Sequence, residues 1–195
     1  MAKKNNSLEK LVNELDELGY FNQCAPEAVD DVKKKALYAK CIYGIDGIKR
    51  DYVVDFEDLT EFGARSFLLK IKPFLKKAGV KIKSIQQNID SQIGYVMSIN
   101  NVDYLLYDWK ELRALDLWKR CAVRIFDIIN EILDEANSKE RLYLLFLMDE
   151  IRIIFLTEEM YAAIVASSTI KNDEKPFSIE EYILMQTLKE VSYRS

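Results

Sequence analysis

The sequence predicts an α+β fold, in which a mainly antiparallel sheet of about five or six strands is covered by a long amphipathic helix, with further helices near both ends of the chain. Two observations lead to this prediction. Short runs of branched and aromatic residues occur in pairs around tight turns, which is typical of antiparallel hairpins. Elsewhere, apolar residues recur every three or four positions, which is typical of helices that bury one face.

Two helices are predicted before the first strand. The first covers 7–18, where leucines recur at helical spacing, and Gly19 ends it. The second begins at Pro26, whose missing N–H costs nothing in a first helical turn, and runs to Gly44. A strand is predicted over 52–56, because the residues there are β-branched and aromatic.

Helical spacing returns after Gly63 and continues to Gly79, with Pro73 expected to bend or interrupt the helix. Residues 80–83 then alternate between apolar and charged side chains, which predicts a short strand.

A hairpin and a long helix are predicted next. Strands over 95–99 and 102–107 are joined at Asn100-Asn101, because asparagine tolerates the positive φ of tight turns. The helix is predicted over 108–136 and is expected to lie on the sheet. Its apolar stripe comprises Leu115, Trp118, Ala122, Ile125, Ile129, Ile132 and Ala136.

The last part of the chain predicts a second hairpin and two helices. Runs over 142–147 and 151–156 are almost continuously apolar, which favours strands central in the sheet. Thr157 is expected to cap a helix, and Ser178 with Glu181 fits a capping box before the final helix. We therefore expect one α+β domain over 1–166. Over 167–195 we expect a loop and a C-terminal helix that packs on this domain or on a partner.

Composition excludes several classes of function. The 195 residues contain no histidine, so the usual Ser-His and Cys-His nucleophile pairs cannot be built. No glycine-rich nucleotide loop is present, and the three cysteines are too widely spaced for a zinc site, so we expect no cofactor. A net charge of −4 disfavours a nucleic-acid partner. No apolar stretch approaches the roughly 18 residues that cross a bilayer, so we expect no membrane partner and a cytoplasmic protein.

Carboxylates form the best candidate site. Four of them cluster after the predicted strand over 52–56, and three aromatic residues are candidates for an exposed binding surface. The candidate binding residues are Asp55, Glu57, Asp58, Glu61, Tyr104, Tyr107 and Trp109. The same carboxylates could hold a hard cation, although their spacing does not match an EF-hand, or they could be solvated acids at the start of a helix. We assign no catalytic residue and no metal ligand.

Lysines form the single basic concentration of the chain. On a helix followed by a strand, several of them could share a face that meets an acidic ligand or a lipid headgroup. A solvated face is the alternative. The lysines are Lys70, Lys72, Lys76, Lys77, Lys81 and Lys83.

Several short patterns together resemble a known family. They include Asp55 to Glu61 with Gly63, Phe67-Leu68, Pro73-Phe74-Leu75, Gly79-Val80, Tyr95-x-Val-x-x-x-Asn101, Leu106-Tyr107, Asn130-x-x-Leu133 and Glu140-Arg141-Leu142-Tyr143. With them the chain resembles an uncharacterised family of small cytoplasmic bacterial α+β proteins over most of residues 50–160. The resemblance supports the domain and implies no activity, so no site residue follows from it.

These observations favour a non-enzymatic protein that binds another protein. An immunity or antitoxin protein, which neutralises a basic partner by covering it, suits the acidic charge, the small size and the aromatic content. The alternative is a carboxylate-based, metal-dependent enzyme that uses the Asp55–Glu61 cluster. A homodimer through the long helix or the last helix is a third hypothesis.

Overall fold

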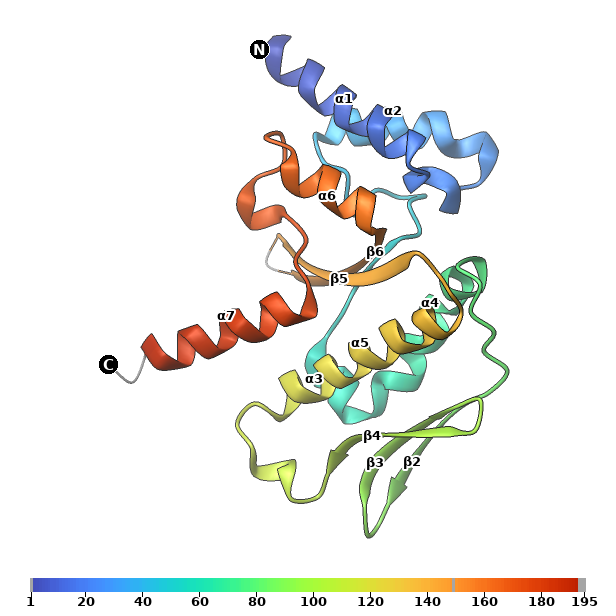
Figure 1. Cartoon of the computed structure of the whole chain (residues 1–195), viewed down its shortest axis with the longest axis vertical. Coiled ribbons are helices and arrows are strands. Elements are labelled where there is room, and N and C mark those ends of the chain that lie inside the picture. The colour runs from blue at the N-terminus through green and yellow to red at the C-terminus, as the bar shows by residue number, and fades with distance from the viewer. Residues whose placement is uncertain (1, 149, 193–195) are drawn as a thin grey trace. The chain divides into compact units, whose positions relative to one another are not determined.

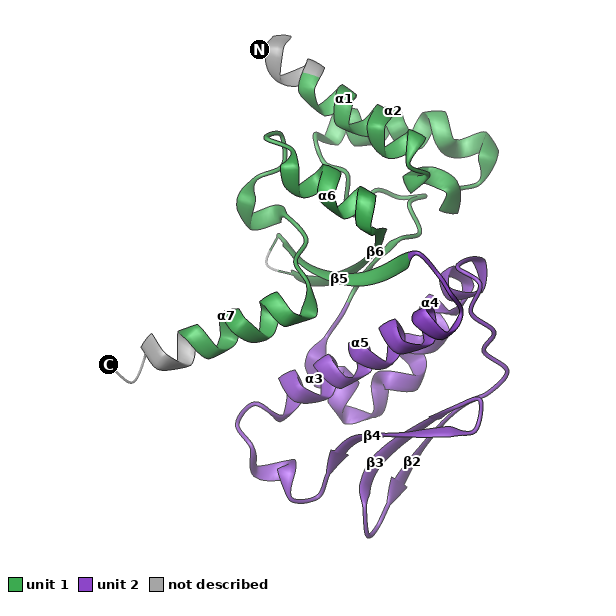
Figure 2. Cartoon of the chain, in the orientation of Figure 1, with its two compact units in different colours: residues 1–53, 140–195 green, residues 54–139 purple. Residues whose placement is uncertain are grey.

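The computed structural model describes residues 2–148 and 150–192, with side chains over 7–148 and 150–188. Among these residues the strands form two three-stranded antiparallel sheets. The chain divides into two compact units: residues 1–53 with 140–195, and residues 54–139 (Figure 2). The α+β class and the antiparallel pairing are confirmed, but the prediction of one sheet of five or six strands is wrong. The predicted division into a domain over 1–166 and a loop with a C-terminal helix over 167–195 does not coincide with these units and stays a prediction.

The first unit contains a sheet of order β1-β6-β5, formed by Asp51–Val53, Glu150–Thr157 and Glu140–Leu147. Figure 1 labels two of these strands, β5 and β6. Its helices are α1 (Ala2–Glu17), α2 (Val29–Ala39), α6 (Glu158–Ala166) and α7 (Ile179–Ser192), with 3-10 turns at Tyr20–Gln23, Pro26–Ala28 and Asn172–Glu174. One core joins the sheet to α1, α2 and α6, and includes Leu11, Leu15, Val32, Leu145, Ile154, Leu156 and Ile164.

Buried Arg50 ties the first unit together. Its side chain is 2% exposed, and its Nη1 donates to both carboxylate oxygens of Glu140 at 2.8 Å. The same guanidinium donates to three backbone carbonyls: those of Gly19 (3.0 Å), Tyr20 (2.5 Å) and Phe155 (3.1 Å). One side chain therefore joins the turn after α1 to both strands of the β5–β6 hairpin. A buried charge is tolerated here because its donors are paired.

The second unit places two helices on one face of a sheet of order β2-β3-β4 (Figure 1). The strands are Ile85–Asp90, Gly94–Ile99 and Val102–Asp108. The helices are α4 (Ala64–Lys77) and α5 (Leu117–Glu135), preceded by the short α3 (Phe56–Asp58) with a π-helical turn at Leu59–Gly63, and by a 3-10 turn at Glu111–Arg113. Tyr95, Met97 and Leu106 point into the core from the sheet, and Ile71 and Ile125 from the helices.

Helix ends show where local signals succeed. Thr157 accepts a bond from the Met160 N–H at 3.3 Å, which confirms the predicted cap of α6. Ser178 and Glu181 bond each other's backbone N–H groups at 3.1 and 2.6 Å, which confirms the capping box of α7. Asn100 and Asn101 adopt φ of 53° and 67° in the β3–β4 turn, as predicted.

Several boundaries are wrong for identifiable reasons. The predicted strand over 52–56 is cut to Asp51–Val53, because Asp55 instead caps a helix. Residues 80–83 form no strand. The strand β2 begins at Ile85, and its polar run of Gln86, Gln87 and Asn88 lacks the apolar alternation that would have revealed it.

The helices differ from prediction as well. The second ends at Ala39 rather than near Gly44. Pro73 lies within α4 without ending it, because Pro73 is exposed and the carbonyl one turn earlier can be solvated. The long helix begins at Leu117, not at 108, so Leu115, predicted on its buried stripe, is 99% exposed.

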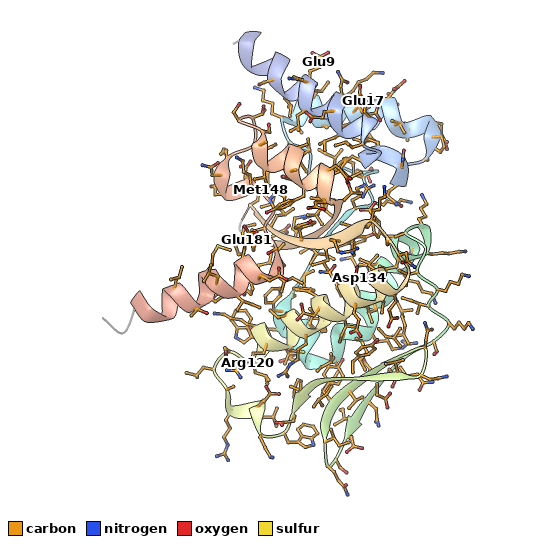
Figure 3. The ribbon with its side chains drawn as sticks, in the orientation of Figure 1. Glu9, Glu17, Arg120, Asp134, Met148 and Glu181 are labelled. Atoms are coloured by element: carbon orange, nitrogen blue, oxygen red, sulfur yellow. The ribbon has the colours of Figure 1, made fainter. Side chains whose placement is uncertain are left out.

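The β5–β6 hairpin is also only partly as expected. It pairs over its full length, but only β6 is central, since β5 is an outer strand that gains one bridge between Leu144 and Phe177. Met148, in the turn between the two strands, is 87% exposed (Figure 3).

Candidate functional site

The four predicted carboxylates lie at the start of the second unit and are all exposed. We call Asp55, Glu57, Asp58 and Glu61 the acidic turn. Asp55 is the N-cap of α3, and its Oδ1 accepts bonds from the N–H groups of Glu57 (2.9 Å) and Asp58 (3.3 Å). Acids are favoured at this end of a helix because unpaired N–H groups point toward them. The side chains of Glu57, Asp58 and Glu61 are exposed, although the Asp58 carboxylate lies against Gly63.

Phe62 follows the acidic turn in a conformation that bulky residues rarely adopt. Its φ is 76° and its ψ 14°, and Glu61 before it is also non-helical, so the helical path is interrupted between α3 and α4. The left-handed region costs a residue other than glycine roughly 1–2 kcal/mol. Such outliers persist only where surrounding contacts hold them, and they gather at functional sites. Phe62 nevertheless remains 38% exposed.

Phe62 lies at one end of a row of aromatic rings that contact one another in sequence. Its ring meets Tyr95 edge-on with centroids 5.0 Å apart, Tyr95 meets Tyr107 at 5.5 Å, and Tyr107 meets Trp109 at 6.3 Å. The Tyr107 hydroxyl donates to the Thr60 carbonyl at 3.5 Å, which links β4 to the interrupted turn. Burial raises the pKa of both tyrosines, so they remain neutral donors at physiological pH.

The sequence-predicted aromatic residues are not part of the exposed acidic surface. Tyr107 is only 4% exposed, so its prediction as a surface residue is wrong. Trp109 is half-buried and donates its indole N–H to the Asp90 carbonyl at 2.8 Å. Tyr104 is half-buried, and its pKa is raised by burial and then by Glu131 and Glu135, which places it beside α5. Phe62, for which the sequence offers no signal, is partly exposed directly after the acidic turn, whereas Phe56 within the turn is buried.

A second ion pair lies beside Trp109. Glu111 and Arg124 form a fork in which both carboxylate oxygens accept guanidinium N–H groups at 2.8 Å. The hydrogen bonds from Arg124 lower the pKa of Glu111 to about 2, against a smaller opposing effect of burial. Because Arg124 also donates to the Leu106 carbonyl at 2.7 Å, this pair fastens α5 to β4 and is structural.

The carboxylates of the acidic turn are not gathered around one point. Over the residues that the structure describes, no group of three or more histidine, cysteine, aspartate or glutamate side chains is placed to hold a metal ion. The hypothesis that the chain is a metal-dependent enzyme stays a prediction, and calorimetric titration with Mg²⁺ tests it.

Comparison of the chain with protein families, with curated proteins and with solved structures finds no match in any of the three. The resemblance to a bacterial family accordingly remains a prediction. Within the described part of the chain, every helix is too short or too polar to cross a bilayer.

Proposed function

We propose that this chain is a non-enzymatic binding protein that covers a basic region of another protein, as an immunity or antitoxin protein does. One observation carries the proposal: the partly exposed ring of Phe62, held at a φ of 76° directly after four exposed carboxylates. An apolar side chain next to polar groups follows the usual layout of a protein interface, and carboxylates among those groups suit a basic partner.

The arrangement supports binding in two ways. The Phe62 ring is positioned before binding, because Tyr95 packs edge-on against it and its backbone is already in the left-handed conformation. Little conformational entropy is therefore lost when a partner binds. The carboxylates that precede Phe62 in the chain attract a basic partner and raise the association rate, an effect that weakens as salt is added. Phe62 thus contributes to the lifetime of the complex, and the acidic turn to its formation.

The first experiment is affinity purification of the tagged chain from its native host at low salt, with mass spectrometry of proteins that elute in near-equal amounts. We expect one specific basic protein. If replicate preparations yield the chain alone, the proposal is wrong.

Variants then locate the interface. Glu57→Gln with Glu61→Gln should lower the association rate and its dependence on salt, whereas Phe62→Gly should mainly speed dissociation. The matched control is Glu9→Gln with Glu17→Gln, which removes two exposed carboxylates from α1 (Figure 3). Equal losses in the control and the test variants would show that net charge, and not the acidic turn, drives binding.

A further inference from the structure

The second unit carries a strongly basic segment that the proposed function does not use. Between residues 62 and 89 the chain has seven lysines and arginines and no aspartate or glutamate, although the whole chain has a net charge of −4. We call these seven side chains together the basic face; they are Arg65, Lys70, Lys72, Lys76, Lys77, Lys81 and Lys83.

The structure places these cations on the outer side of α4 and on the extended segment that leads to β2. All are exposed except Lys72, which is half-buried. The opposite side of α4 is fully committed to the core through Phe67, Leu68, Ile71, Phe74 and Leu75. The charged side therefore cannot be turned inward without unpacking the unit.

The cations leave an apolar strip along the middle of this surface. With 100° between successive residues, Leu69 and Pro73 fall at the centre of the exposed side of α4. Lys72 and Lys76 lie on one flank of that strip, and Lys70 and Lys77 lie on the other. Leu69 is 41% exposed and Pro73 is exposed. The result is a short apolar ridge bordered by lysines on both sides.

We propose that the basic face docks the second unit onto an anionic lipid surface. Lysines on the two flanks would meet headgroup phosphates and carboxylates, as clusters of basic residues do on anionic lipid, while Leu69 and Pro73 rest at the boundary with the acyl chains. The expectation of no membrane partner was based on the absence of a spanning segment, and docking of this kind needs none.

Nucleic acid fits this surface less well. Proteins that bind single strands stack bases on aromatic side chains, but the two aromatic residues of α4, Phe67 and Phe74, are buried. Arginine is favoured in nucleic-acid recognition because its planar guanidinium donates two parallel hydrogen bonds, and six of the seven cations here are lysines. An exposed leucine at the centre of the surface suits lipid better than a phosphate backbone.

Co-sedimentation of the 195-residue chain with vesicles tests the proposal. We expect binding to phosphatidylcholine vesicles that contain about one-third phosphatidylserine, loss of binding to pure phosphatidylcholine, and weakening as salt rises. Lys72→Gln, Lys76→Gln and Lys77→Gln together should weaken partition on the order of a hundredfold. The matched control, Lys10→Gln, Lys35→Gln and Lys49→Gln, removes the same number of lysines, all of them exposed and outside the basic face, and should bind nearly as well as the unaltered chain.

Leu69→Gln separates lipid from other polyanions. It should weaken vesicle binding several-fold and leave binding to a duplex DNA fragment unchanged, because only the lipid surface receives the apolar ridge. The proposal is overturned if the chain fails to bind the anionic vesicles at low salt, if the control loses as much affinity as the test variant, or if DNA binds more tightly than the vesicles.

Discussion

Removing the charge of Glu140 should destabilise the first unit strongly. Breaking a buried ion pair by removing one partner costs about 3–5 kcal/mol, because the remaining charge stays buried. Arg50 is 2% exposed, and the side chain of Glu140 is 13% exposed. Glutamine keeps an acceptor near Nη1, so we expect Glu140→Gln to lie at the lower end, with a cost of about 3 kcal/mol. Domains are typically stable by only about 5–15 kcal/mol, so this effect is large.

Arg50→Met should cost more than Glu140→Gln. It removes the same pairing and also the bonds to the carbonyls of Gly19, Tyr20 and Phe155, each with a net worth of about 1 kcal/mol. We therefore expect about 4–6 kcal/mol for Arg50→Met.

Native-state hydrogen exchange of the β5 and β6 amides measures both changes without requiring that the whole chain unfold in one step. Glu150→Gln is the control. The Glu150 side chain is 52% exposed and pairs with Arg152 at the surface, so its loss should cost under about 1 kcal/mol. The reasoning is refuted if Glu140→Gln stays within about 0.5 kcal/mol of the unaltered chain, or if Arg50→Met costs less than Glu140→Gln.

Three further predictions concern the second unit. Tryptophan fluorescence reports the unfolding of this unit, because Trp109 and Trp118 both lie in it. Phe62→Gly should change the free energy of unfolding by no more than about 1 kcal/mol relative to the unaltered chain, because glycine adopts the left-handed conformation without strain and this offsets the lost contact with Tyr95. A much larger loss of stability would show that the ring is mainly structural. Gly94→Ala should destabilise by about 2 kcal/mol or more, because φ is 146° and the new Cβ would overlap a backbone carbonyl of β4; a neutral result would contradict that geometry. For Glu111, the pKa of about 2 lies below the unfolded value of 4.5, so its stabilisation is complete above about pH 4.5 and is lost toward pH 2. Glu111→Gln should therefore be less stable at pH 7, by on the order of 2 kcal/mol, and the difference should vanish near pH 2; a constant difference would count against the ion pair.

The candidate site could be predicted only in part. The cluster of Asp55, Glu57, Asp58 and Glu61 is visible in the sequence, because the four acids are neighbours along the chain. Phe62 was not recognisable, because no local pattern favours a left-handed phenylalanine, and its conformation depends on Tyr95 and on the rings behind it. The prediction that Tyr107 lies on the surface is wrong, because the sequence of a strand does not show which of its two faces will be covered.

Local chemistry therefore determined what lies within a few residues along the chain: the capping box of Ser178 and Glu181, the Thr157 cap, the Asn100-Asn101 turn and the α+β class. These features depend on side chains that bond their own neighbouring backbone, or on a period that each segment carries by itself. The tertiary structure decided how the strands are shared between two sheets, because pairing β1 with β6 joins residues about 100 positions apart. It also decided that Arg50 would be buried, since that depends on Glu140 and on carbonyls brought together only by folding. Pairings over such distances are selected by the packing of the whole chain, and no local pattern encodes them.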